Sequence, residues 1–293
     1  MVLDSILMST QDLERGQGEM PAVRPRKPWV REVVIVLTFY WVYQAIRRAA
    51  SNPGSTTRAY ANANRLIDWE RRLHLYNEQF VQSLFLGSDA FIRLINVYYG
   101  TLHFVVTAGL LVWLFLRRPG QYRRMRNLLG TATGLALIGY WTFPLAPPRL
   151  VPCNESVPVV GVEPIGECFV DTLHTVGGLW SYQSPAAQAV ANSFAAMPSL
   201  HFGWALWCGL VFLWCLGGRT GRILAVAYPA LTLFAIVVTA NHYWLDAVGG
   251  AIVIGAALLI QKLWTSRQAT RALRDATRPH ASGGAGPAHV STP

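Results

Sequence analysis

The sequence predicts an all-α fold: an integral membrane bundle of six transmembrane helices, with an interfacial helix after the first. Three observations predict it. Hydrophobic residues make up 52% of the 293 residues and charged residues only 14%, a balance typical of membrane proteins. Apolar runs of about 20 residues, the length of a membrane-spanning helix, recur along the chain. Arginine and lysine gather between these runs in a pattern that orients a bundle.

Six apolar runs are the predicted spanning helices. The first is the weakest, because it is short and Arg47 and Arg48 lie at its end. The interfacial helix is predicted over Arg65–Phe85, where apolar residues recur at helical spacing between arginines. In chain order, the spanning runs are Val33–Ala50, Phe91–Leu116, Asn127–Ala146, Ala195–Leu216, Ile223–Ala240 and Trp244–Trp264.

These runs divide the chain into three parts. Residues 1–31 lack the pattern of a cleaved signal peptide and are predicted to be a disordered cytoplasmic N-terminus. Residues 32–265 form the six-helix membrane domain. Residues 266–293 are predicted to be a cytoplasmic tail, largely disordered, because its glycine-rich end has little apolar surface to bury.

Basic residues predict the orientation of the bundle, because short loops rich in them stay in the cytoplasm. Four basic segments share one side of a six-helix bundle, namely Arg24–Arg31, Arg117–Arg126, Arg219–Arg222 and Lys262–Arg274. Both termini are therefore predicted to be cytoplasmic. The net charge of +10 then describes flanks that face anionic lipid, and no nucleic-acid partner is expected.

Ionisable and hydroxyl side chains stand at the mouths of two apolar runs. Ser199 and His201 open one run, and His242 and Asp246 open another. Such residues at the edge of a membrane segment are costly and therefore indicate function. In the predicted topology both clusters lie at the non-cytoplasmic face, and Arg149 lies at the same level.

This set of residues is suited to phosphoryl transfer. Asp246, four residues after His242, can hold one imidazole nitrogen and leave the other as a nucleophile. His201 can protonate a leaving oxygen. Ser199, the backbone N–H groups beside it and Arg149 can hold phosphate oxygens. No zinc-type ligand spacing occurs in the sequence, so we expect neither a metal nor a cofactor.

The two motifs resemble those of the type 2 phosphatidic acid phosphatase superfamily. Pro198–His201 is similar to its Pro-Ser-Gly-His motif, with Leu200 in place of the common glycine. His242 with Asp246 four residues on is similar to its third motif. The Pro-Ser-Leu-His, Asn-His-Tyr and Ala-Pro-Pro-Arg segments more narrowly resemble the branch of inositol phosphorylceramide synthases (inositolphosphotransferases) and their bacterial relatives.

The resemblance implies that residues 32–265 are a phosphatase or phosphotransferase domain in the plasma (inner) membrane. His242 is expected to become phosphorylated, Asp246 to support it, His201 to act as the acid and Ser199 to contact the phosphate. The implied substrate is a lipid phosphate or phospholipid, and the acceptor is water, an alcohol or a sugar. A phosphatase and a phosphotransferase share one such site, so the motifs do not separate them.

Two cationic positions of the superfamily hold apolar residues in this chain. Leu111 stands at the lysine position of the first motif, and Ile236 stands at the arginine position six residues before His242. Arg149 is the expected replacement, with Arg93 as the alternative.

Two alternatives stay open at this point. If the chain is not an enzyme, we expect a non-catalytic membrane transporter or a haem-binding protein that uses His103, His201 and His242. The position of His103, considered alone, favours a packed, hydrogen-bonded role for it. Cys153 and Cys168 lie in the long outer connection and are suitably placed to pair in an oxidising compartment.

Overall fold

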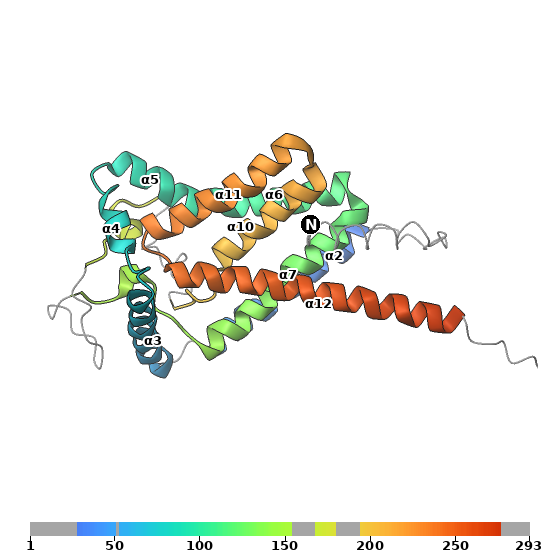
Figure 1. Cartoon of the computed structure of the whole chain (residues 1–293), viewed down its shortest axis with the longest axis horizontal. Helices are drawn as coiled ribbons and strands as arrows, with labels where there is room; N and C mark the ends of the chain where they lie inside the picture. Colours follow the sequence, from blue (N-terminus) through green and yellow to red (C-terminus); the bar gives the residue numbers. More distant parts are fainter. Residues whose placement is uncertain (1–27, 51–52, 154–167, 180–193, 277–293) are drawn as a thin grey trace, which may run out of the picture. The chain divides into compact units, whose positions relative to one another are not determined.

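The computed structural model describes residues 28–50, 53–153, 168–179 and 194–276 (Figure 1). Within these ranges the chain is helical and has no strand, which confirms the all-α class. Most of the predicted N-terminal segment and of the C-terminal tail lies outside the described residues.

Three helical segments of the described chain are long and apolar enough to cross a membrane. They are Asp89–Arg117, Gly218–Val238 and Trp244–Arg271, and they coincide with three of the predicted runs. Leu200–Leu216 is apolar but shorter. The composition and length of these helices are those of a membrane protein, and the count of six spans stays a prediction.

The helix predicted over Arg65–Phe85 is instead two helices, α3 (Pro53–Arg72) and α4 (Glu78–Ser83). His74, between them, has a φ of 56°, in the left-handed region that a right-handed helix cannot include. The single-helix prediction was wrong because apolar spacing carries no signal of such a break.

The remaining long helices follow the predicted runs with shifted ends, whereas the short η2 and α8 lie in the connection between two of these runs. α2 belongs to a compact unit of its own, Met1–Arg48, and α12 continues beyond the predicted domain boundary at residue 265. The π-helical turns η1 and η3 lengthen α6 and α10. The bounds are α2 Pro28–Ala50, α5 Asp89–Val97, η1 Tyr98–Leu102, α6 His103–Arg117, α7 Pro119–Thr142, η2 Pro148–Leu150, α8 Thr172–Thr175, α10 Leu200–Val211, η3 Phe212–Leu216, α11 Gly218–Val238 and α12 Trp244–Ala276.

Helix α10 is the central element of the second compact unit, Ala49–Pro293. It packs against α6, α7, α11 and α12 (Figure 1). Trp207 of α10 is fully buried and donates its indole N–H to the carbonyl of Met125 in α7, at 2.8 Å. This packing fixes α10, so its first turn has a defined position relative to the turn between α11 and α12.

Candidate active site

The turn between α11 and α12 brings His242 and Asp246 together. The amides of Asn241 and His242 both donate to the carbonyl of Ile236, at 3.0 and 3.2 Å, and so fold the chain back at the end of α11. His242 Nδ1 lies 3.2 Å from Asp246 Oδ2, and both side chains are buried. The carboxylate therefore orients the ring through Nδ1 and leaves Nε2 on the far side.

Asp246 also joins the two sequence motifs. Its Oδ2 atom accepts the amide of Tyr243 at 3.0 Å. Its backbone carbonyl accepts the amide of Ser199 at 2.9 Å. The start of α10 and the start of α12 are thus in direct contact, although they lie far apart in the sequence.

Ser199 is buried and caps α10. Its Oγ atom accepts the amide of Phe202 at 3.3 Å, which satisfies one of the donors left open at a helix start. The hydroxyl proton is still free to donate, because the oxygen acts only as the acceptor in this bond. The amides of Leu200 and His201 in the same turn have no acceptor within the helix.

His201 stands beside His242 in a cluster of rings. The two imidazole centroids are 5.7 Å apart, close enough for both rings to reach one phosphoryl group. Tyr99 stacks on His201 at 4.2 Å, and Phe104 meets it edge-on at 5.3 Å. The Nε2 atom of His201 is buried and has no hydrogen-bond partner among the described residues. The aromatic neighbours therefore fix the ring plane and leave this nitrogen for another group.

His103 packs against the same cluster from α6. Its ring centroid is 5.3 Å from that of His201, and its Nδ1 atom is 3.1 Å from the hydroxyl of Tyr228. These contacts agree with the packed, hydrogen-bonded role expected for His103. Tyr228 gave no signal in the sequence, because it meets His103 only through the packing of α11 on α6.

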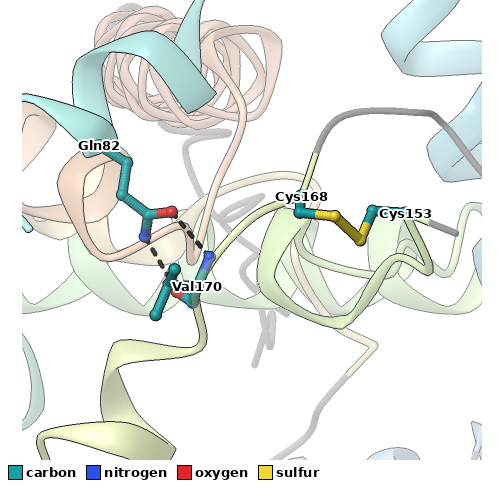
Figure 2. The surroundings of a disulfide bond; sticks show 4 residues. All are labelled: Gln82, Cys153, Cys168 and Val170. Atoms are coloured by element: carbon teal, nitrogen blue, oxygen red, sulfur yellow. Dashed lines mark hydrogen bonds between the residues drawn. A yellow bond between two sulfur atoms is a disulfide. The ribbon is translucent and has the colours of Figure 1, made fainter.

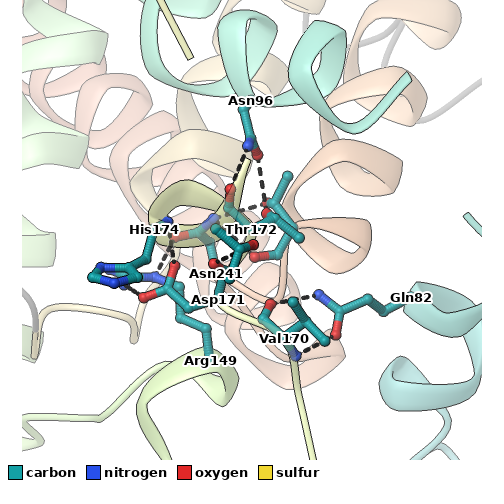
Figure 3. Close-up of polar contacts among 10 residues, drawn as sticks. Gln82, Asn96, Arg149, Val170, Asp171, Thr172, His174 and Asn241 are labelled. Atoms are coloured by element: carbon teal, nitrogen blue, oxygen red, sulfur yellow. Dashed lines mark hydrogen bonds and ion pairs between the residues drawn. The ribbon is translucent and has the colours of Figure 1, made fainter. Parts of the chain in front are cut away.

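Arg149 lies next to the turn between α11 and α12 that carries His242, called the histidine turn below. Its amide donates to the carbonyl of Ala240 at 3.0 Å, and its Nε donates to Asn241 Oδ1 at 2.9 Å. Its Nη1 donates to Asp171 Oδ2 at 2.8 Å, and both charged side chains are partly exposed (Figure 3). Arg149 therefore lies beside the turn that carries His242, and Asp171 balances part of its charge. Asp171 is an acid that the sequence analysis did not select.

The segment that carries Asp171 is held from two sides. Gln82 of α4 exchanges two hydrogen bonds with the backbone of Val170, at 2.9 and 3.0 Å (Figure 2). Asn96 of α5 donates to the carbonyl of Thr172 at 2.8 Å and accepts from its hydroxyl at 3.0 Å. These buried amides fix the approach of Asp171 to Arg149.

A disulfide joins Cys153 and Cys168 in the connection between α7 and α10, which is the pairing suggested from the sequence (Figure 2). It links the chain just after Arg149 to the chain just before Asp171. The cross-link therefore ties together the two segments that supply this ion pair.

Two buried carboxyl groups that sequence reasoning missed stand behind the histidine turn. Glu70 of α3 accepts the amide of Leu245 at 2.8 Å, and Glu78 of α4 accepts the amide of Trp244 at 3.2 Å. Burial raises the pKa of Glu70 to about 10, and a hydrogen bond with Glu78 and its negative charge add to the rise. Burial raises the pKa of Glu78 as well.

A signal for Glu70 was present in the sequence. Ala63, Leu66 and Ile67 precede it at helical spacing, and all are buried. A carboxylate that continues a buried apolar stripe is unusual and indicates a specific partner.

The fold and the site together define a class of protein. It is a membrane protein whose helices bring two histidines, a carboxylate and a capped helix start into one site. A family model described as the PAP2 superfamily matches residues 64–260. This match covers more than half of the 293 residues, so the chain belongs to the PAP2 superfamily. Comparisons with individual curated proteins and with solved structures found no match. Members of the superfamily are in general phosphatases and phosphotransferases.

The two apolar replacements are part of the hydrophobic packing. Ile236 is fully buried near the end of α11, and Leu111 packs into the core formed around α10. Arg93 lies exposed on α5. The side chain of Arg149 contacts Asn241, the residue next to His242.

Proposed function

We propose that the protein catalyses metal-independent phosphoryl hydrolysis or transfer on a lipid phosphate substrate, through a phosphohistidine formed on His242. The observation that carries this proposal is the pairing of two imidazoles, 5.7 Å apart, of which the buried His242 is oriented by Asp246. Membership in the PAP2 superfamily supports the same chemistry.

In the first half-reaction, Nε2 of His242 attacks phosphorus while the bond from phosphorus to the leaving oxygen breaks. His201, protonated at this stage, gives its proton to that oxygen. In the second half-reaction, neutral His201 takes a proton from water or an alcohol, whose oxygen attacks phosphorus. The phosphorus–nitrogen bond breaks and His242 is regenerated.

The charge on the transferred phosphoryl group needs donors aimed at its oxygens. The hydroxyl of Ser199 and the amides of Leu200 and His201 lie together at the start of α10. Arg149 supplies positive charge from the neighbouring segment, in place of the superfamily cations replaced by Leu111 and Ile236. We assign these groups to the phosphate.

We further propose that the site faces the non-cytoplasmic side of the plasma (inner) membrane, with both termini in the cytoplasm. α10 and η3 run away from His201, and α11 returns to His242, so Arg219 and Arg222 lie at the opposite end of this hairpin. Arginines at that end favour the cytoplasm.

A phosphatase would use water as the acceptor, and a phosphotransferase similar to inositol phosphorylceramide synthases would use an alcohol or a sugar. The decisive experiment follows turnover of lipid phosphates and phosphatidylinositol by detergent-purified protein in EDTA, with free phosphate and new lipid products both measured. His242→Ala should abolish either product. His74→Asn is the matched control, because His74 is exposed and asparagine tolerates its positive φ.

The covalent step has its own readout. A radiolabelled substrate should leave an acid-labile, base-stable phosphoryl group on the wild-type protein and on His201→Ala, and none on His242→Ala. Bound substrate without turnover in any variant would favour the non-catalytic transporter, and a haem absorption spectrum would favour the haem protein.

A further inference from the structure

Three consecutive backbone donors at the start of α12 are occupied by carboxyl groups. Tyr243 donates to Asp246, Trp244 to Glu78 and Leu245 to Glu70. These three amides are those of the residues between His242 and Asp246. The backbone that sets the geometry of this pair is therefore held from α3 and α4.

Glu70 and Glu78 are fully buried and lie within hydrogen-bonding reach of each other. Glu70 uses Oε1 for the Leu245 amide, and its Oε2 atom has no donor among the described residues. Two ionised carboxylates cannot satisfy each other, since neither has a proton to donate. One proton on Glu70 Oε2, donated to Glu78, satisfies both groups and removes a buried like-charge contact.

The charged and titratable groups around Glu70 and Glu78 also favour protonation of one of the two carboxyl groups. Asp246 of α12 and the hydroxyl of Tyr243, in the turn before α12, face the pair, and Tyr76 lies in the loop between α3 and α4. Arg71, in the last turn of α3, lies over the ring of Tyr76 with its guanidinium carbon 4.9 Å from the ring centroid. With both glutamates ionised, three carboxylates would meet at one buried helix start.

We propose that Glu70 and Glu78 share one proton and act as positioning residues for the turn that carries His242 and for the first turn of α12, which carries Asp246. The kinetic part of this inference rests on the proposed function. The shared proton itself does not, and it has a separate test below.

Glu70→Gln copies the protonated state, because its carbonyl accepts the Leu245 amide and its NH₂ group donates to Glu78. We expect kcat and KM within about threefold of wild type for this variant. Glu70→Ala leaves the Leu245 amide unpaired and should lower kcat by about tenfold or more with KM little changed. Asp68→Asn, at an exposed acid of α3, is the matched control and should behave as wild type.

The alkaline limb of the pH profile separates positioning from a merely structural role. Ionisation of the second carboxyl group should lower wild-type kcat at high pH, and Glu70→Gln should lack this loss. Equal loss of kcat in Glu70→Gln and Glu70→Ala overturns the shared proton, and wild-type kcat in Glu70→Ala overturns the positioning role.

Thermal unfolding in detergent tests the proton without any activity. A carboxyl group with a raised pKa contributes stability that is fully present below its ordinary value and is lost as the pH rises through its raised value, about 10 for Glu70. The wild-type melting temperature should therefore fall toward alkaline pH more steeply than that of Glu70→Gln. Parallel curves refute the shared proton. Divergent curves in a protein with no turnover refute only the proposed function.

Discussion

Gly250→Ala tests whether the contact between α10 and α12 positions the two motifs. A Cβ atom on Gly250 would press into the carbonyl oxygen of Ser199, and it would lie 3.2 Å from the amide nitrogen of Gly203. Both neighbours are backbone atoms, so neither can turn aside. The amide of Ser199 also donates to the carbonyl of Asp246, so any separation of the helices moves the residues of both motifs.

The loss of stability in Gly250→Ala can be estimated by comparison with Gly255→Ala, a matched variant on the same helix. Gly255 is exposed and has no atom within 4 Å of its Cβ position. Replacing glycine by alanine inside a helix gains about 0.5–1 kcal/mol in both variants. Overpacking costs about 1–3 kcal/mol and applies only to Gly250. The two alanine variants should therefore differ by about 1–3 kcal/mol, with Gly250→Ala the less stable.

Two measurements test this prediction, one of stability and one of turnover. Unfolding by SDS titration measures the free energy difference between the two variants. Turnover of the best lipid phosphate should fall by about tenfold or more in Gly250→Ala, because small misplacements of reacting groups are costly. Gly255→Ala should keep wild-type turnover. Equal stability and full turnover in both variants would show that this close approach does not position the site.

Three further changes probe the site residues and the connection between α7 and α10. Arg149→Ala should raise KM by about 10- to 100-fold through loss of a charge-assisted phosphate contact, and an unchanged KM would remove Arg149 from the phosphate. Asp246→Asn should lower kcat on the order of 10²–10⁴-fold by favouring the wrong tautomer of His242, and retained kcat would contradict its orienting role. Cys153→Ser should lower the unfolding free energy by about 3 kcal/mol, given the 15-residue separation from Cys168. Reductant should then have no further effect on this variant, whereas a further loss would point to another target.

The sequence predicted the helices well where apolar runs are long. The runs near α6, α11 and α12 needed only composition, because a spanning helix is recognised by length and hydropathy. Helix ends were harder. α10 begins at Leu200 and not at Ala195, because Ser199 caps it. The break at His74 depends on one backbone angle that periodicity does not encode.

The sequence predicted those contacts of the site that join residues close together in the chain. His242 and Asp246 are separated by one helical turn, so their contact follows from the sequence once a helix is assumed. Tyr228, Asp171 and Glu78 meet the site through contacts between distant elements, and no spacing rule relates them to the motifs. A single sequence therefore indicates the residues that do chemistry more readily than those that hold them.

The two helix starts that meet at the site differ in how their donors are used. At α12 the first-turn amides bind Glu70, Glu78 and Asp246, so the positive end of that helix already stabilises protein carboxyl groups. At α10, Ser199 caps one amide, and those of Leu200 and His201 have no acceptor within the helix. An incoming phosphate dianion is repelled by the first helix start and attracted by the second. We therefore infer that phosphate oxygens bind at α10, which puts phosphorus between His201 and His242 and leaves Asp246 behind the nucleophile.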